Sequence, residues 1–173
     1  MTPEQFQKIY PLLTGWIATT LSSHAPAARN VASAGFKRLS LYYSPELLAR
    51  AKFVPVAKVP VPPLTAMGLP QFADFEHMDA GGITYLDTYF VRQDQVQFER
   101  LHFHELIHVV QWLTLGPERF LLAYADGLER FGYRPSPLET MAYDAEEAFA
   151  RGHPTFDAEK LVRQQIASLT GQV

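Results

Sequence analysis

The sequence predicts an α+β protein with a mostly helical second half and a small β-sheet, in one domain over residues 1–173. Two patterns predict this class. Residues 81–92 have the composition of a strand and follow a β-leaning, proline-rich segment at 53–69, whereas helical patterns fill the chain after residue 94. Hydrophobic residues make up 47% of the 173 residues, which is enough for one packed core.

The chain is expected to begin with a helix. Thr2-Pro3-Glu4-Gln5 predicts its start, because Thr caps a helix, Pro fits its first position and Gln completes a capping box. Apolar residues then recur at helical spacing until Ser22-Ser23, namely Phe6, Ile9, Leu13, Ile17 and Leu21. We expect this helix to cover the core; an interfacial or partner-binding helix is the alternative.

The segment from 24 to 69 is expected to be less regular. KRLSLYYS, residues 37–44, is a plausible strand, and Ser44-Pro45-Glu46 predicts a short helix to about Lys52. The prolines of 53–69 exclude a long helix and favour extended, edge-like or irregular chain. Because Phe53 and the valines there are too apolar to hang free in solvent, we expect this segment to wrap the surface.

The second half shows clear start and stop signals. GGITYLDTYFVR, residues 81–92, predicts a strand, because β-branched and aromatic residues follow a glycine pair. Asp94 and Gln97 predict the start of a long helix that ends at Gly116. Further helices are predicted over 117–131, about 136–151 and about 156–169, because proline or serine can begin each helix and glycine follows its end.

Composition and charge exclude several classes of protein. A net charge of −3 and a pI near 6.0 give no electrostatic footprint for nucleic acid. No uncharged apolar run approaches the ~20 residues of a membrane span, and the N-terminus lacks a signal-peptide pattern, so we expect a cytoplasmic protein. Cysteine is absent, so imidazole and carboxylate groups must hold any transition metal.

HFHELIH, residues 102–108, contains the motif HExxH. On a helix, His104 and His108 stack on one face, which suits two nitrogens about 2.0–2.1 Å from one zinc ion. Glu105 lies about 100° round the helix, where it can reach a water molecule on the metal and act as general base. His102 lies on nearly the opposite face, so we exclude it as a ligand. Gln111 shares the face of His104 and is expected either to orient a ligand or substrate, or to be an ordinary polar residue.

The alternative for this motif is a pair of histidines whose hydrogen bonds are satisfied on an ordinary helix. The neighbouring Phe103, Leu106, Ile107 and Val110 make the helix largely apolar, and buried imidazole and carboxylate groups are costly there without a strong partner. Zinc would be such a partner. A catalytic zinc site also needs a third protein ligand, and the best candidate is a carboxylate of the segment PLETMAYDAEEAFAR.

HELIHVVQ, followed about thirty residues further on by Glu139-Thr-Met-Ala-Tyr143, resembles the gluzincin-type HExxH zinc metallopeptidases over residues 102 to about 147. The resemblance implies a zincin-like fold with the small sheet packed on the active-site helix, and Zn2+ as cofactor. It implies His104, His108 and Glu139 as metal ligands and Glu105 as the catalytic base.

The sequence departs from this family at Tyr143, where many members have Asp. The hydrogen bond that Asp would give a ligand histidine must therefore come from Tyr143, from Asp144 or from elsewhere. Glu139 has a second interpretation, as a capping box with Ser136. The rival ligands are Glu146 and Glu147, which lie two turns further along the predicted helix.

The family resemblance gives the strand at 83–91 and several side chains a possible role. That strand is expected either to bind extended substrate by backbone pairing or to be purely structural. The residues that could stabilise an oxyanion are Tyr85, Tyr89, Tyr124, Tyr133, Tyr143 and His153. We expect a zinc-dependent hydrolase, a metallopeptidase acting on a peptide or protein. The alternative is a non-catalytic zinc-binding or partner-binding protein that retains the site.

Overall fold

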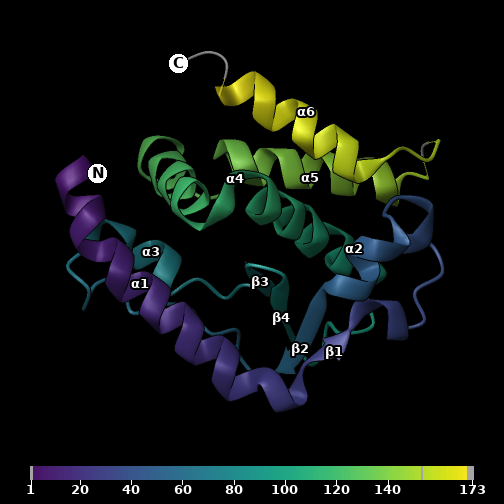
Figure 1. The fold of residues 1–173 in the computed structure, drawn as a ribbon, viewed down its shortest axis with the longest axis horizontal. Coiled ribbons are helices and arrows are strands. Elements are labelled where there is room, and N and C mark those ends of the chain that lie inside the picture. Colours follow the sequence, from purple (N-terminus) through teal and green to yellow (C-terminus); the bar gives the residue numbers. More distant parts are fainter. Residues whose placement is uncertain (1, 153, 171–173) are drawn as a thin grey trace.

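The computed structural model describes residues 2–152 and 154–170 and confirms the α+β class (Figure 1). Its helices are α1 Pro3–His24, α2 Pro45–Arg50, α3 Ala73–Glu76, α4 Glu99–Phe131, α5 Pro137–Ala150 and α6 Ala158–Thr170. Its strands are β1 Arg29–Asn30, β2 Lys52–Val56, β3 Gly82–Tyr85 and β4 Thr88–Arg92. Short 3-10 turns occupy Ala25–Ala27, Val31–Ser33, Leu39–Leu41 and Pro70–Phe72. None of the helices in this part of the chain is long and apolar enough to cross a membrane.

The strands form one mixed sheet in the order β1-β2-β4-β3. β4 pairs in parallel with β2 and antiparallel with β3, so the predicted strand at 81–92 is in fact a hairpin. The turn of this hairpin falls at Leu86 and Asp87, and Leu86 has a φ of 60°. A leucine rarely takes this left-handed conformation. The turn could not be recognised in the sequence because it lacks the glycine or asparagine that usually marks such a turn.

The proline-rich segment starts inside the sheet and not at its edge, because β2 lies between β1 and β4. β1 pairs only with Lys52 and Phe53. Pro55 lies beyond this pairing, so its missing N–H costs no bond to β1. The prediction that the apolar side chains of this segment pack inward is confirmed, since Phe53, Val54 and Val59 are buried.

The expected strand at 37–44 is wrong. This segment forms a turn and the 3-10 turn Leu39–Leu41, and it buries Leu39, Tyr42 and Tyr43 at a helical spacing. The backbone N–H groups of Arg38 and Leu39 donate to the Glu99 carboxylate at 2.8 and 3.2 Å. These contacts fix the turn against the first residue of α4.

The start of α4 differs from its prediction, whereas its interior break agrees. The N-cap is Phe98, and Asp94 instead forms an ion pair with Arg92. α4 consists of two helical halves that meet at a kink at Gly116, which has a φ of 73°. Gly132 ends the second half. At α1 the predicted capping box is present, with Thr2 and Gln5 as its partners.

α4 is the central element of the fold. It contacts β3 and β4 on one side and α5 and α6 on the other (Figure 1). Phe103 of α4 is fully buried and stacks on Phe149 of α5 with ring centroids 4.4 Å apart. α1 adds a further layer through Phe6 and Ile17, each 4% exposed, so it covers the core as expected. This packing holds the first half of α4 rigidly between the sheet and α5.

Candidate metal centre

Three side chains from two helices converge at the middle of the molecule. His104 and His108 of α4 and Glu139 of α5 are 4%, 5% and 1% exposed. The two Nε2 atoms lie 3.1 Å apart, and the Glu139 carboxylate oxygens lie 3.3 Å from Nε2 of His108 and 3.6 Å from Nε2 of His104. Tetrahedral bonds of 2.0–2.1 Å separate ligand atoms by roughly 3.3–3.4 Å. Oε1 is the oxygen near His108 and Oε2 the one near His104, so the two nitrogens and the Glu139 carboxylate are spaced close to what the ligands of one zinc ion would require.

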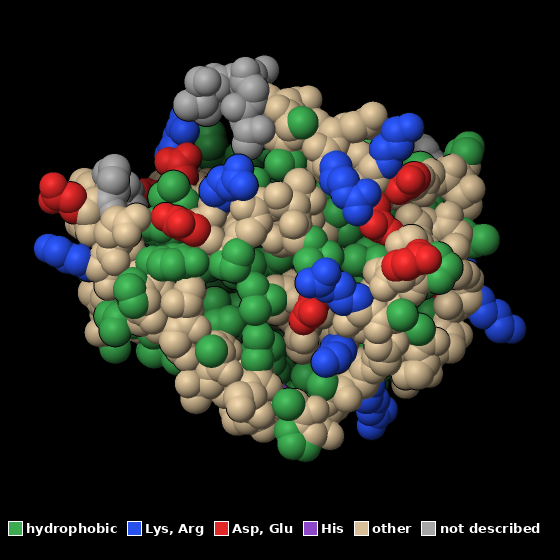
Figure 2. All heavy atoms as spheres, in the orientation of Figure 1, with side chains coloured by type: hydrophobic (Ala, Val, Ile, Leu, Met, Phe, Trp, Pro, Cys, Tyr) green, Lys and Arg blue, Asp and Glu red, His purple; other side chains and the backbone are tan. Residues whose placement is uncertain are grey.

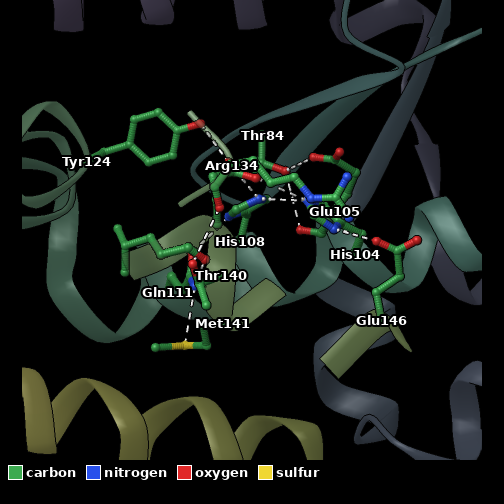
Figure 3. Close-up of polar contacts among 12 residues, drawn as sticks. Thr84, His104, Glu105, His108, Gln111, Tyr124, Arg134, Thr140, Met141 and Glu146 are labelled. Carbon is green, nitrogen blue, oxygen red and sulfur yellow. Dashed lines mark hydrogen bonds and ion pairs between the residues drawn. The ribbon is translucent and has the colours of Figure 1, made fainter. Parts of the chain in front are cut away.

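Hydrogen bonds fix the direction of both imidazole rings (Figure 3). Nδ1 of His104 lies 2.9 Å from a Glu146 carboxylate oxygen, and Nδ1 of His108 lies 2.8 Å from the Gln111 amide oxygen. Both oxygens are acceptors, so each Nδ1 carries the hydrogen and each neutral ring presents a lone pair at Nε2. Two lone pairs 3.1 Å apart repel each other unless a cation or a proton lies with them.

Gln111 connects the two helices of the site. Its amide nitrogen donates to the Leu138 carbonyl oxygen of α5 at 2.9 Å, which leaves its amide oxygen for His108. The amide orientation follows from this network. The sequence left Gln111 open between an orienting and an ordinary role. Its place three residues after His108 is a signal that could have pointed to the first.

The Glu139 carboxylate has a free acceptor at the centre of the site. Its Oε1 atom accepts a hydrogen bond from the Tyr124 hydroxyl at 2.7 Å. Its Oε2 atom is buried and has no hydrogen-bond partner within residues 2–152 and 154–170. An unpartnered buried carboxylate oxygen is costly, and a cation held with the two imidazoles would satisfy it.

The electrostatics of the site also favour a positive charge. Burial lowers the pKa of His104, but the carboxylates of Glu139 and Glu146 outweigh it and raise that pKa to about 10. Burial likewise raises the pKa of Glu139, but His108 and His104 outweigh it and hold that pKa well below its usual range. The two imidazoles and the carboxylate therefore need a positive charge between them, and their nitrogen and oxygen donors suit zinc.

Glu105, the residue after His104, points toward β3 and is 3% exposed. Its Oε2 atom accepts a hydrogen bond from the Thr84 hydroxyl at 2.7 Å (Figure 3). The absence of a side chain at Gly82 makes room for it, because a Cβ there would lie 2.4 Å from Glu105 Oε1. Burial raises the pKa of this carboxyl. Glu105 thus lies beside the three converging side chains without joining them.

The rival candidates lie elsewhere. Glu146 faces Nδ1 of His104 and also binds Arg100, so its carboxylate accepts the hydrogen bond that orients the His104 ring. Tyr143 instead packs its ring 4.6 Å from that of His104. Glu147 is partly exposed and pairs with Arg151. The interpretation of Glu139 as a capping residue is wrong, because α5 has no side-chain cap bond and Glu139 faces the histidines.

Among the residues that the structure describes, no further histidine joins the group of His104, His108 and Glu139. His102 is fully buried, with Nδ1 2.7 Å from the Tyr89 hydroxyl and Nε2 2.9 Å from the Val96 carbonyl oxygen. Its exclusion as a ligand is therefore confirmed. His153 lies outside the described residues. Of the candidate tyrosines, Tyr85, Tyr124 and Tyr133 line the same cavity as Glu139, and the Tyr85 hydroxyl donates to the Pro60 carbonyl oxygen.

Comparisons with known proteins return no match, since no family model, no curated protein and no solved structure resembles the chain closely enough to be reported. The family resemblance of residues 102–147 stays a prediction from two short motifs. What the chain can do chemically therefore follows from its own geometry.

Gln111→Met is expected to lower the affinity for zinc by about 10–100-fold, because His108 loses the acceptor that fixes its ring. The change nearly conserves volume, so the core should persist. Competition with a coloured chelator measures the affinity, and Gln165→Met, on the exposed face of α6, is the control. Equal zinc affinity in both variants would show that Gln111 does not orient the site.

Proposed function

We propose that this chain is a zinc-dependent hydrolase of the metallopeptidase type, with a zincin-like fold. The spacing of the two Nε2 atoms and the Glu139 carboxylate, 3.1 to 3.6 Å apart, is the observation that carries the proposal. A zinc ion held there would polarise the carbonyl group to be cleaved and lower the pKa of the attacking water. The chain's own residues perform the remaining steps.

Glu105 is the proposed general base. Its Oε2 atom already accepts from Thr84, so Oε1 is the atom free to take a proton from the attacking water. The same atom then returns that proton to the leaving amine. Thr84 and Gly82 hold the carboxylate in place from β3, so the proton moves along a fixed direction.

Peptides are the proposed substrates because an edge strand lies beside Glu105. β3 is the last strand of the sheet, and β4 is its partner. Gly82 and Thr84 alternate along it with Ile83 and Tyr85, and all four line the cavity next to the candidate metal centre. An extended peptide can add to such an edge by backbone pairing at Gly82, whereas the Thr84 carbonyl oxygen already accepts a hydrogen bond from the Trp112 indole.

The number of protein ligands favours a catalytic zinc site over a structural one. Structural zinc sites are closed by four protein ligands, whereas catalytic sites have three and an open position. Among the described residues, His104, His108 and Glu139 form the group that could hold a metal ion, and a cavity adjoins them. This arrangement supports turnover over a purely structural or sensing role.

The direct test is hydrolysis of a defined peptide mixture by the full chain, followed by mass spectrometry. We expect new peptide ends with zinc present, their loss after chelation and their return when zinc is added back. A protein that binds zinc tightly but cuts no peptide, amide or ester in such mixtures would contradict the proposal.

Gly82→Ala is expected to lower kcat by about 100-fold with zinc still bound, because the new Cβ pushes the Glu105 carboxylate from its position. Gly81→Ala is the matched control. Its Cβ would meet Oε1 of Gln95, the far end of a flexible side chain that can move aside. Equal rates for the two variants would show that the position of Glu105 does not matter.

A further inference from the structure

A cavity of about 100 Å³ adjoins the candidate metal centre. Its inner end is formed by Glu105, His108 and Glu139. Its walls come from α1, the segment 61–80, β3 and the second half of α4. Figure 2 shows hydrophobic side chains, in green, gathered around a hollow between the regions of α1 and α4.

The walls away from the inner end are apolar. They include Phe6, Leu13, Phe72, Phe75, Leu121 and Leu128. Among the described residues, no lysine, arginine or aspartate lines this cavity, and its charged groups are those of the inner end. A charged substrate group would lose its hydration there without gaining a partner, whereas an apolar group would be stabilised by burial.

The cavity also has the right size for one side chain. An apolar cavity of roughly 150 Å³ takes up benzene. A volume of about 100 Å³ is of the same order, which suits one side chain of the size of leucine or phenylalanine. Because β3 forms one wall, a peptide paired with β3 would direct its side chains toward or away from this cavity in alternation.

We propose that this cavity is a specificity pocket for a bulky apolar side chain of a peptide, on the residue next to the bond that is cleaved. Cleavage of that bond rests on the proposed hydrolase function, whereas binding of the side chain in the cavity does not. The pocket selects leucine- and phenylalanine-like residues and rejects lysine and aspartate. α1 is its outer wall, through residues spread over about three turns from Phe6 to Ile17.

Trp112 offers a local reporter of occupancy. It lines the cavity, stacks on Phe120 at 4.0 Å and donates its indole N–H to the Thr84 carbonyl oxygen at 3.1 Å. The chain has 2 tryptophans, so Trp16→Phe leaves Trp112 as the single one. A capped peptide with para-bromophenylalanine should quench its fluorescence on contact. The titration uses the full chain with Trp16→Phe and Glu105→Gln in the presence of zinc. The Glu105→Gln change prevents the proposed cleavage of the peptide during the titration.

Competition against this probe measures the selectivity. Capped peptides with leucine or phenylalanine at the same position should displace it at concentrations at least about 10-fold lower than those with lysine or aspartate. Equal displacement by all four, or no quenching at all, would overturn the pocket assignment. Displacement by decanoyl amide but not by the phenylalanine peptide would overturn it too, since the cavity would then be an acyl-chain site.

A matched pair of variants on α4 checks where the probe binds. Ala125→Phe fills the cavity and should weaken probe binding by about 10-fold or more, whereas Ala123→Phe, on the exposed face, should not. Melting curves establish that both variants fold, and the competition series holds even if Ala125→Phe does not. Selective binding without any hydrolysis would contradict the hydrolase proposal and leave the pocket assignment standing.

Discussion

Glu105→Gln is expected to lower kcat by about 10²–10⁴-fold, the usual contribution of a general base. Glutamine has nearly the same shape and can still accept the hydrogen bond from the Thr84 hydroxyl. It cannot take a proton from water, so the attack slows. The zinc content should stay at the wild-type level, because Glu105 is not among the three converging side chains. Steady-state rates on a peptide cut by the wild type, with zinc analysis of the same sample, measure both.

Glu118→Gln is the control for this change, since Glu118 is an exposed residue of the same helix, α4. It should keep the wild-type kcat. An undiminished kcat in Glu105→Gln would remove this residue as the base. Unchanged biological activity with bound zinc in that variant would favour the non-catalytic zinc-binding alternative.

Glu139→Ala is expected to lower zinc affinity by more than about 100-fold, beyond the effect of changing a residue that only orients a ligand. The change leaves two imidazoles without their carboxylate partner, and hydrolysis should fall with the bound zinc. Metal analysis after dialysis against a weak chelator measures the loss. Glu147→Ala, a change on the same helix at a partly exposed residue that pairs with Arg151, should keep wild-type zinc and activity. Equal zinc content in the two variants would mean that another group holds the metal.

Local sequence signals predicted much of the fold. Thr2 with Gln5, Gly116 with Pro117, and Gly132 mark helix ends through contacts and conformations confined to a few residues. The place of His104 and His108 on one face of α4, with ring centroids 4.9 Å apart, also follows from helical periodicity alone. The proximity of Glu139 was expected through the family resemblance, because its own sequence context fitted a capping box with Ser136 as well as a metal ligand.

Other features depend on contacts between residues far apart in the chain. The turn at Leu86 has a conformation that leucine rarely adopts, so the packing of β3 and β4 must impose it. Tyr124, Thr84 and Glu146 reach the site from different elements, and no spacing in the sequence relates them to His104. The proline-rich segment could be recognised as packed chain, but not as an interior strand, because β1 is two residues long.

Diffraction from a crystal of the zinc-loaded protein, recorded on both sides of the zinc absorption edge, tests the proposed metal centre most directly. We predict one anomalous peak per chain, about 2.0–2.1 Å from Nε2 of His104, from Nε2 of His108 and from one Glu139 oxygen. A peak elsewhere, or none between these side chains under conditions where zinc is bound, would contradict the account.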